Sequence, residues 1–220
     1  MTGPTVVPVR QVIASYIGGG WGSELPDAEF SEPAAVIRGT DFARVGVGDV
    51  SSCPQRFHKA SNIRSRRLRS GDVIFEVSGG SQDQPVGRTL LVDERILGRF
   101  DGDVIPASFC KLVRPDHDRV NPQYLTYFFE WLYMTREIMQ FQVQSTGISN
   151  FQFEQFLDDQ LMRLPSMEAQ TKIAAILSAY DDLAVARLEN LRETRSLLLP
   201  SLISGQLPVE GLEITLPQMA

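Results

Sequence analysis

The sequence predicts an α+β protein: a mixed α/β domain followed by a long C-terminal helix that forms a coiled coil. Short β-branched or aromatic runs bounded by Gly, Asp and Pro fill residues 1 to about 120, a pattern typical of strands in a compact domain. Residues 166–199 contain neither Gly nor Pro, as expected of one long helix. We therefore predict a domain over 1–165, a helix over 166–205 and a tail over 206–220. With 43% apolar residues, the 220-residue chain can bury a core of this size.

Strands are predicted at four runs: AAVIRG (34–39), DVIFEVSG (72–79), GRTLLV (87–92) and SFCKLV (108–113). Asn121 and Pro122 then open a helix, with Asn as the N-cap and Pro at the first helical position. We expect this helix to continue to Phe141 and to bury one apolar stripe in the core. The stripe consists of Tyr124, Phe128, Leu132 and Met139.

A polar segment, QSTGISNFQFEQF (144–156), interrupts that helical pattern. Its Ser, Thr, Asn and Gln side chains could read base edges, and a solvated loop is the alternative. A further strand is predicted to end at Leu164 and Pro165.

The long C-terminal helix is predicted to start at Ser166, with Ser as N-cap and Glu168 near the positive end of the helix dipole. Its apolar or aromatic residues recur at nearly heptad spacing, at Ile173, Leu177, Tyr180, Ala184, Leu188, Leu191 and Leu198. From 168 to 199 it would extend about 48 Å, more than a small domain covers. The stripe therefore predicts a coiled-coil partner, either a second copy or another protein. We expect Pro200 and Gly205 to end the helix.

Positive charge is concentrated in one part of an acidic chain, which carries 21 Lys and Arg against 27 Asp and Glu. No acid lies between Asp49 and Asp72, and six basic residues do: Arg56, Lys59, Arg64, Arg66, Arg67 and Arg69. The planar guanidinium matches phosphate oxygens and guanine edges, so this cluster indicates nucleic-acid binding. A solvated face paired to acids elsewhere in the fold is the alternative, and genomic base composition alone would also favour Arg over Lys.

Membrane and secreted classes are not expected. No stretch approaches 18 uncharged apolar residues, and the N-terminus MTGPTVVPVR lacks the basic start and apolar centre of a signal peptide. Two cysteines, Cys53 and Cys110, cannot form a disulfide framework and fit a reducing compartment. We therefore expect a cytoplasmic protein.

The usual catalytic patterns are missing from the sequence. Asn121-Pro122-Gln123-Tyr124 differs at its third residue from the Asn-Pro-Pro-Tyr motif of amino-methyltransferases, and the helix cap explains it with fewer assumptions. No Lys has an acid two positions before it, as a common nuclease motif requires. Cys53, His58, Cys110 and His117 lack zinc-site spacing, and the glycine runs at 18–20 and 79–80 lack the Lys-Ser/Thr of a nucleotide loop. We expect a protein that is not an enzyme and binds no metal or cofactor.

Together, several segments in order resemble the DNA-specificity (S) subunit of type I restriction-modification systems, in a half-length form. They are Ile17-Gly18-Gly19-Gly20, Val36 to Asp41 (VIRGTD), Ser70 to Phe75 (SGDVIF), Val86-Gly87-Arg88, Ser145-Thr146-Gly147, Leu164 to Leu177 (LPSMEAQTKIAAIL) and Leu202 to Leu207 (LISGQL). The most specific of them is LPSMEAQTKIAAIL, which is similar to the family's Gln-x-x-Ile-Ala signature at the entry to its conserved helix.

The resemblance implies a target-recognition domain over 1–165 and a spacer helix that docks partners. Full-length members carry two such units and read a split DNA sequence. This chain has one unit, so we expect a homodimer or pairing with a different half, and a palindromic split target if two copies pair. The implied partners are double-stranded DNA, the adenine methyltransferase subunit that binds S-adenosylmethionine, and a translocating nuclease subunit in a complete restriction assembly.

Two sets of site residues follow. We expect DNA contacts from Arg38, Arg56, Lys59, Arg64, Arg66, Arg67, Arg69, Ser81, Arg88, Thr146, Asn150 and Gln152. We expect the helix interface to comprise Gln170, Ile173, Leu177, Tyr180, Ala184, Leu188, Leu191 and Leu198. Two alternatives remain open: an orphan DNA-recognition domain of another defence or modification system, and a coiled-coil scaffold whose N-terminal domain binds protein.

Overall fold

The computed structural model describes residues 5–80, 84–145, 148–204 and 206. It divides into two compact units, Met1–Ala174 and Ala175–Ala220. The first unit takes in the start of the long helix, where Gln170 and Ala174 are buried. This boundary lies later in the chain than the sequence-based division at residue 165. Within the described ranges, no helix is long and apolar enough to cross a membrane.

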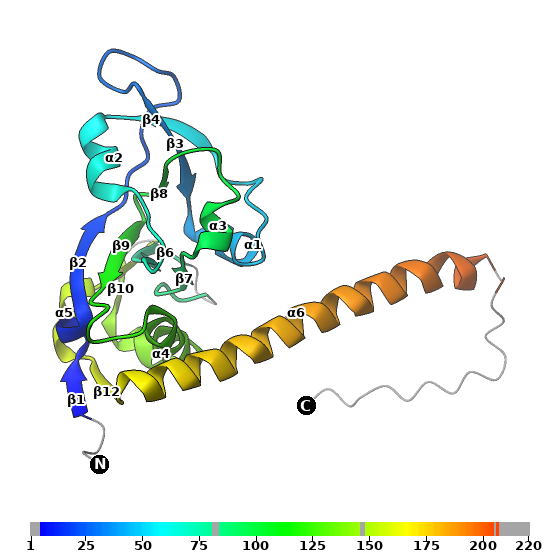
Figure 1. Ribbon diagram of the computed structural model, residues 1–220. Coiled ribbons are helices and arrows are strands. Elements are labelled where there is room, and N and C mark those ends of the chain that lie inside the picture. Colours follow the sequence, from blue (N-terminus) through cyan, green and yellow to red (C-terminus); the bar gives the residue numbers. More distant parts are fainter. Residues whose placement is uncertain (1–4, 81–83, 146–147, 205, 207–220) are drawn as a thin grey trace. The chain divides into compact units, whose positions relative to one another are not determined.

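The first unit contains short strands and short helices in alternation (Figure 1). Its strands are β1 (Thr5–Pro8), β2 (Ile13–Gly18), β3 (Glu32–Ile37), β4 (Gln55–His58), β5 (Val73–Glu76), β6 (Ser78–Gly79), β7 (Thr89–Leu91), β8 (Val104–Pro106), β9 (Cys110–Pro115), β10 (Gln142–Ser145), β11 (Ile148–Phe151) and β12 (Leu161–Leu164). Its α-helices are α1 (Phe42–Gly46), α2 (Ala60–Arg66), α3 (Glu94–Leu97), α4 (Pro122–Met134) and α5 (Phe153–Asp159). Three 3-10 helices are η1 (Val9–Val12), η2 (Gly39–Asp41) and η3 (Glu137–Phe141). The long helix is α6 (Met167–Ile203).

The predicted fold class is confirmed: a mixed α/β domain precedes one long helix. All four predicted runs contain strands, and a strand ends at Leu164 as expected. The strands form four small sheets, in the orders β2-β9-β5-β7, β4-β3-β8, β10-β11-β6 and β1-β12. Only the β3–β8 pairing is parallel among the described strand pairs.

Strand β3 is buried on both faces, which explains its unbroken apolar run. Ala34 and Val36 pack with Ile63 of α2, whereas Ala35 and Ile37 point to the opposite side and pack with the cluster that includes α1 and α3. Successive side chains of a strand alternate between faces, so one apolar run serves two layers. This arrangement seats α2 against the sheet.

A phenylalanine cluster forms the other half of the core. The Phe75 ring of β5 lies 5.0 Å from Phe151, 5.2 Å from Phe153 and 5.5 Å from both Phe129 and Phe156, measured between ring centroids. Aromatic pairs at these separations add to the free energy of area burial, about 0.5–1.5 kcal/mol per pair. The cluster joins β5 and β11 to helices α4 and α5.

Helix α4 begins as predicted and ends earlier. The Asn121 side chain accepts a hydrogen bond from the Tyr124 amide at 3.1 Å, and Pro122 occupies the first turn. The helix stops at Met134 because Arg136 adopts a left-handed conformation (φ 60°), and a 3-10 helix follows. Leu132 is fully buried, and Tyr124 and Phe128 pack on the core.

The continuation of that helix to Phe141 was therefore predicted wrongly. So was the burial of Met139, which lies beyond the helix end and is exposed.

Helix α6 starts where the sequence indicated. The Ser166 hydroxyl accepts a hydrogen bond from the Ala169 amide at 3.3 Å, as an N-cap does. Its predicted end is wrong at Pro200, which lies inside the helix, because α6 continues to Ile203. Gly205 and residues 207–220 of the predicted tail lie outside the described residues.

Candidate nucleic-acid interface

Helix α2 and the residues on either side of it carry a basic surface. Ile63 is buried against β3 and β8, and this fixes which side of the short helix faces outward. The outward side and its flanks present six cations: Arg56, Lys59, Arg64, Arg66, Arg67 and Arg69. We call this set the α2 basic surface.

Three of these six cations are paired to carboxylates elsewhere in the fold. Arg56 Nη1 lies 3.0 Å from Glu24 Oε1, and Arg67 Nη1 lies 3.3 Å from Asp103 Oδ1. Lys59 pairs with Glu29. These three cations therefore fit the alternative interpretation of the cluster, in which the basic residues pair with acids from distant parts of the chain.

The other three differ. Arg64 and Arg69 are exposed and form no ion pair with any residue that the structure describes. Arg66 is held by neutral oxygens: its Nε donates to the Gly18 carbonyl at 2.8 Å and its Nη1 to Asn62 Oδ1 at 3.0 Å. The α2 basic surface therefore retains guanidinium groups that no carboxylate of the described residues pairs with, in a form suited to phosphate oxygens.

Arg38 and Arg88, also predicted to contact DNA, both bind buried carboxylates. Arg38 donates to both oxygens of Asp41 at 2.9 Å, and Arg88 donates to those of Glu76 at 2.9 and 2.6 Å. Burial alone would raise the pKa of Asp41, but hydrogen bonds from Arg38 and from the Ser52 hydroxyl outweigh it and hold that pKa below its usual range. Both arginines thus have a structural role in the fold, and DNA contact by either stays a prediction.

The predicted polar segment forms a hairpin, β10–β11, whose second strand pairs with β6. Ser78 of β6 faces Asn150 of β11, and the Ser78 hydroxyl donates to Asn150 Oδ1 at 2.8 Å. Asn150 and Gln152 are exposed, so both can offer polar atoms to a ligand. Two further predicted contacts, Ser81 and Thr146, lie outside the described residues. We call Ser78, Asn150 and Gln152 the polar hairpin surface.

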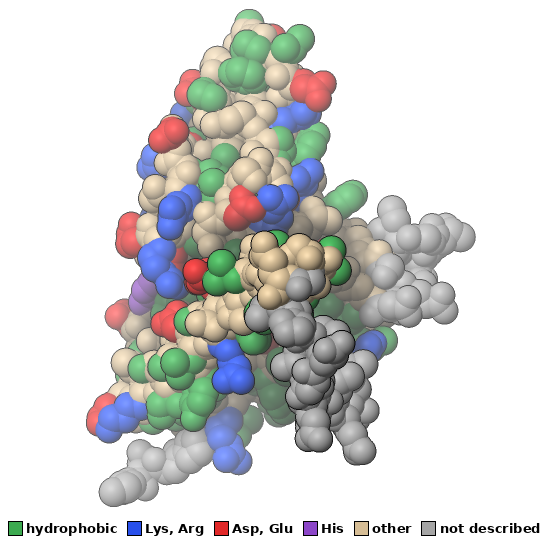
Figure 2. Space-filling model, turned by 90° about the vertical axis from the view of Figure 1, so that its right-hand side faces the viewer, with side chains coloured by type: hydrophobic (Ala, Val, Ile, Leu, Met, Phe, Trp, Pro, Cys, Tyr) green, Lys and Arg blue, Asp and Glu red, His purple; other side chains and the backbone are tan. Residues whose placement is uncertain are grey.

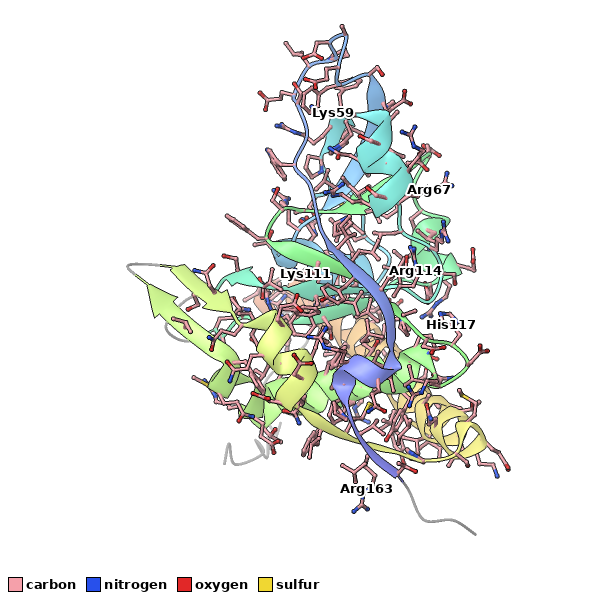
Figure 3. All side chains as sticks on the ribbon, turned by 90° about the vertical axis from the view of Figure 1, so that its left-hand side faces the viewer. Lys59, Arg67, Lys111, Arg114, His117 and Arg163 are labelled. Carbon is pink, nitrogen blue, oxygen red and sulfur yellow. The ribbon has the colours of Figure 1, made fainter. Side chains whose placement is uncertain are left out.

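Two residues near this hairpin were missed in the sequence. Phe109 is exposed, and its carbonyl accepts hydrogen bonds from the Val77 and Ser78 amides next to β6. Lys111 lies over the rings of Tyr16 and Phe153, at 5.5 and 5.2 Å from their centroids. Figure 3 shows Lys111 near the middle of the first unit, with Lys59 and Arg67 toward α2. The alternation of the run SFCKLV was the available signal, because it points residues 109 and 111 away from the buried Cys110 and Leu112.

On the face seen in Figure 2, basic and acidic side chains are interspersed. Lys and Arg lie among Asp and Glu there and form no field of one sign. Such a surface gives little non-specific attraction to a polyanion. What distinguishes α2 is that three arginines without a described ion-pair partner, Arg64, Arg66 and Arg69, lie within six residues of one another.

The described residues contain no group of three His, Cys, Asp or Glu side chains placed to hold a metal ion. Burial raises the pKa of the Cys53 thiol to about 11 and that of Cys110 to about 12, so neither is a thiolate at neutral pH.

Comparison with protein families decides the assignment. The model of the type I restriction modification DNA specificity domain matches residues 63–194, more than half of the chain. The chain belongs to this family. A comparison with curated proteins finds no match.

Solved structures support the same fold for this specificity domain. A chain from work on complex assembly and conformational transition of the type I R-M system aligns over 98% of this chain with a TM-score of 0.61 and 18% identity. The HsdS subunit of Thermoanaerobacter tengcongensis aligns over 97% (TM-score 0.57, 19% identity), and the S subunit of M. genitalium over 88% (TM-score 0.53, 13% identity). The chain spans about half the length of these structures, 52%, 52% and 42% respectively.

Two glycines in the family-like segments of this specificity domain, Gly19 and Gly87, allow close packing. A Cβ on Gly19 would lie 2.1 Å from the Ala107 carbonyl oxygen, because the backbone of that segment passes directly over the β8–β9 turn. A Cβ on Gly87 (φ 106°) would lie 2.7 Å from Ile138 Cδ1. Both positions exclude a side chain, so these segments preserve close backbone approaches.

Helix α6 of the specificity domain exposes the predicted apolar stripe. Leu177, Tyr180, Leu188 and Leu191 are 38–68% exposed, and Ile173 and Leu198 are also accessible. Gln170 was wrongly placed in this interface, because only 1% of it is exposed. Its side chain accepts a hydrogen bond from the Asn121 amide at 2.8 Å and donates to the carbonyls of Arg119 and Pro165. Gln170 thus holds the first turn of α6 against the rest of the first unit.

Proposed function

We propose that this specificity domain is the sequence-specific DNA recognition subunit of a type I restriction-modification methyltransferase/endonuclease complex and catalyses no reaction itself. The α2 basic surface binds phosphates, and the polar hairpin surface contacts base edges. The observation that carries this proposal is that Arg64, Arg66 and Arg69, grouped at α2, have no carboxylate partner among the described residues of an acidic protein. Phosphate contacts set register on a duplex, whereas polar side chains such as Asn150 and Gln152 supply sequence information. A protein that acts on the DNA of its own cell is expected in the cytoplasm.

The proposal also gives α6 a role in pairing. Its exposed leucines would be costly to leave in water, since about 25 cal/mol is lost for each Å² of apolar surface. A second α6, from another copy or from a different half-subunit, offers the same near-heptad stripe and covers it in a coiled coil. Two recognition domains joined in this way would read two half-sites, and identical domains would read a palindromic split target. The methyltransferase subunit, and a translocating nuclease subunit where one exists, would bind the paired assembly.

Light scattering of the purified chain, alone and mixed with the methyltransferase subunit of the same system, tests this function. A dimer, or a stable complex with two copies of each subunit, supports it. Selection from a random duplex library should then enrich a sequence in two parts separated by a constant gap.

Other results favour the alternatives. If the chain does not bind the methyltransferase subunit but selects a single short sequence from the duplex library, it is an orphan recognition domain of another system. A chain that enriches no DNA sequence and still oligomerises is a scaffold.

A further inference from the structure

The connection between β2 and β3 projects as a loop above β4 (Figure 1). Residues 21–31 of this loop contain three acids and no Lys or Arg, and we call it the acidic loop. Ser23 and Phe57 exchange backbone hydrogen bonds of 2.8 and 2.9 Å, which anchor its first half to β4. Asp27 Oδ1 accepts from the amides of Glu29 and Phe30, both at 2.7 Å, and shapes its second half.

The loop is seated closely on the strand beneath it. Gly22 has a φ of 69°, and a Cβ there would lie 2.4 Å from the Phe57 carbonyl oxygen and 2.6 Å from the His58 ring. This close approach positions the carboxylates that follow in the chain. The geometry of the loop is therefore fixed by its contacts with β4.

Two carboxylates of the acidic loop form ion pairs with cations of the α2 basic surface. Glu24 binds Arg56, whose guanidinium carbon also lies 4.7 Å from the centroid of the Trp21 ring. Only 12% of the Arg56 side chain is exposed as a result. Glu29 binds Lys59, which lies over the Phe30 ring at 5.2 Å. Each cation is thus held between a carboxylate and an aromatic ring of the same loop.

We propose that the acidic loop limits the affinity for the DNA backbone: Glu24 and Glu29 compete with DNA phosphates for Arg56 and Lys59 and so weaken binding to duplexes that lack the target sequence. The inference rests on the proposed DNA-binding function. A phosphate that binds either cation must first displace a carboxylate, which exchanges one ion pair for another. The cost of that exchange is the same for every duplex. It matters most for non-target DNA, which is bound through phosphate contacts alone.

The salt dependence of binding measures this competition directly. Each cation that neutralises a phosphate releases counterions and contributes about −0.9 to the slope of log K against log salt concentration. While Glu24 and Glu29 hold their partners, those two cations contribute little on non-target DNA. Each cation released from its glutamate should steepen the slope by about 0.9. Releasing both should therefore make the affinity fall about twelvefold further between 50 and 200 mM salt.

Single variants of the full chain, Glu24→Gln and Glu29→Gln, and the double variant provide the test. Fluorescence anisotropy with a random-sequence duplex, titrated at several KCl concentrations, gives affinity and slope. Glu32→Gln is the matched control, because it removes one nearby negative charge at the end of the same connection without freeing a cation. We expect tighter non-target binding and a steeper slope for Glu24→Gln and Glu29→Gln than for Glu32→Gln. Adding Arg56→Gln to Glu24→Gln should abolish the gain.

The outcomes separate this inference from the function on which it rests. If binding depends on Arg64 and Arg69 but the three glutamate variants behave alike, the competition is refuted and DNA recognition stands. If Glu24→Gln keeps its gain in the Arg56→Gln background, a general field effect replaces the specific pairing and the inference is again overturned. A chain that binds no duplex at 50 mM salt in any variant refutes both.

Discussion

Asp72 and Arg114 form a bidentate ion pair in which both nitrogen–oxygen distances are 2.8 Å. Asp72 immediately precedes β5, and Arg114 lies on the neighbouring strand β9. The same carboxylate accepts a hydrogen bond from the Arg69 amide at 2.8 Å, so it also fixes the chain that leaves the α2 basic surface. The pair explains the family-like SGD segment as a structural brace between two core strands.

Replacing Asp72 by Asn should destabilise the first unit by about 3–5 kcal/mol, because the Asp72 side chain is only 2% exposed and Arg114 would lose its counter-charge. Urea unfolding followed by circular dichroism measures the change in the free energy of unfolding. Asp159→Asn, at an exposed site, is the control and should change it by less than about 0.5 kcal/mol. Equal stability of the two variants would show that the pair does not brace the strands.

Replacing Arg64 and Arg69 by Ala should weaken binding to duplex DNA and reduce the steepness of its salt dependence by about 1.8, because two phosphate contacts are lost. Stability should barely change, since neither guanidinium has an ion-pair partner in the described structure. The control removes two other exposed arginines, Arg136 and Arg163, by the same substitution. Similar losses from both pairs would indicate a diffuse charge effect in place of a contact at α2.

Replacing Leu177 and Leu188 by Asp should dissociate the oligomer, because charge in the seam of a coiled coil is left without solvent. Light scattering gives the mass, and the thermal unfolding of the first unit should be unchanged. Ala179→Asp with Ala186→Asp adds the same charge at exposed positions of α6 off the stripe and should leave the oligomer intact. An oligomer that survives the leucine substitutions would place the interface elsewhere.

The Cys110 thiol should make stability fall at alkaline pH. Burial raises the pKa of this thiol to about 12 in the folded protein. In the unfolded chain its pKa is that of a free cysteine, about 8.5. Below about pH 8 the thiol is neutral in both states and does not affect the free energy of unfolding. Between about pH 8.5 and 12 it ionises only in the unfolded chain, so the free energy of unfolding falls as the pH rises. Denaturant unfolding at pH 7.0 and 9.5 should show a smaller loss in Cys110→Ala than in the unmodified protein. Identical losses would mean that other groups account for the alkaline sensitivity.

Local pattern predicted the strands in the four apolar runs, the strand that ends at Leu164 and the starts of α4 and α6. It did not predict β1, β2, β4 or β8, nor the short helices α1, α2, α3 and α5. Runs such as AAVIRG contain a strand because both faces of β3 meet apolar neighbours, and the cap formed by Asn121 depends on residues only three apart. The hairpin β10–β11 was not predicted, because its polar strands are stabilised by pairing with β6, far away in sequence. The end of α4 depends on the left-handed Arg136, a conformation that no Gly signals.

The sequence could predict the cluster of DNA-binding candidates but not which of its members are free to bind DNA. Six basic residues cluster in the sequence around α2, but whether each is free depends on acids distant in the chain, such as Glu24 for Arg56 and Asp103 for Arg67. Nothing local distinguishes the paired Arg67 from the unpaired Arg69 two residues later. The burial of Gln170 was equally hidden in the sequence, because its side chain binds backbone groups about 50 positions earlier in the chain, such as the Asn121 amide.

The pairing of β1 with β12 has a consequence for synthesis of the chain. Thr5 lies opposite Leu164, so the N-terminal strand finds its partner only when almost the whole first unit has been made. At typical elongation rates of about 5–20 residues per second, β1 waits roughly 8–32 s on the ribosome without its neighbour. Cold-sensitive expression, or a need for chaperones during translation, would therefore arise from the late pairing of β1 and from no defect in the core of the first unit.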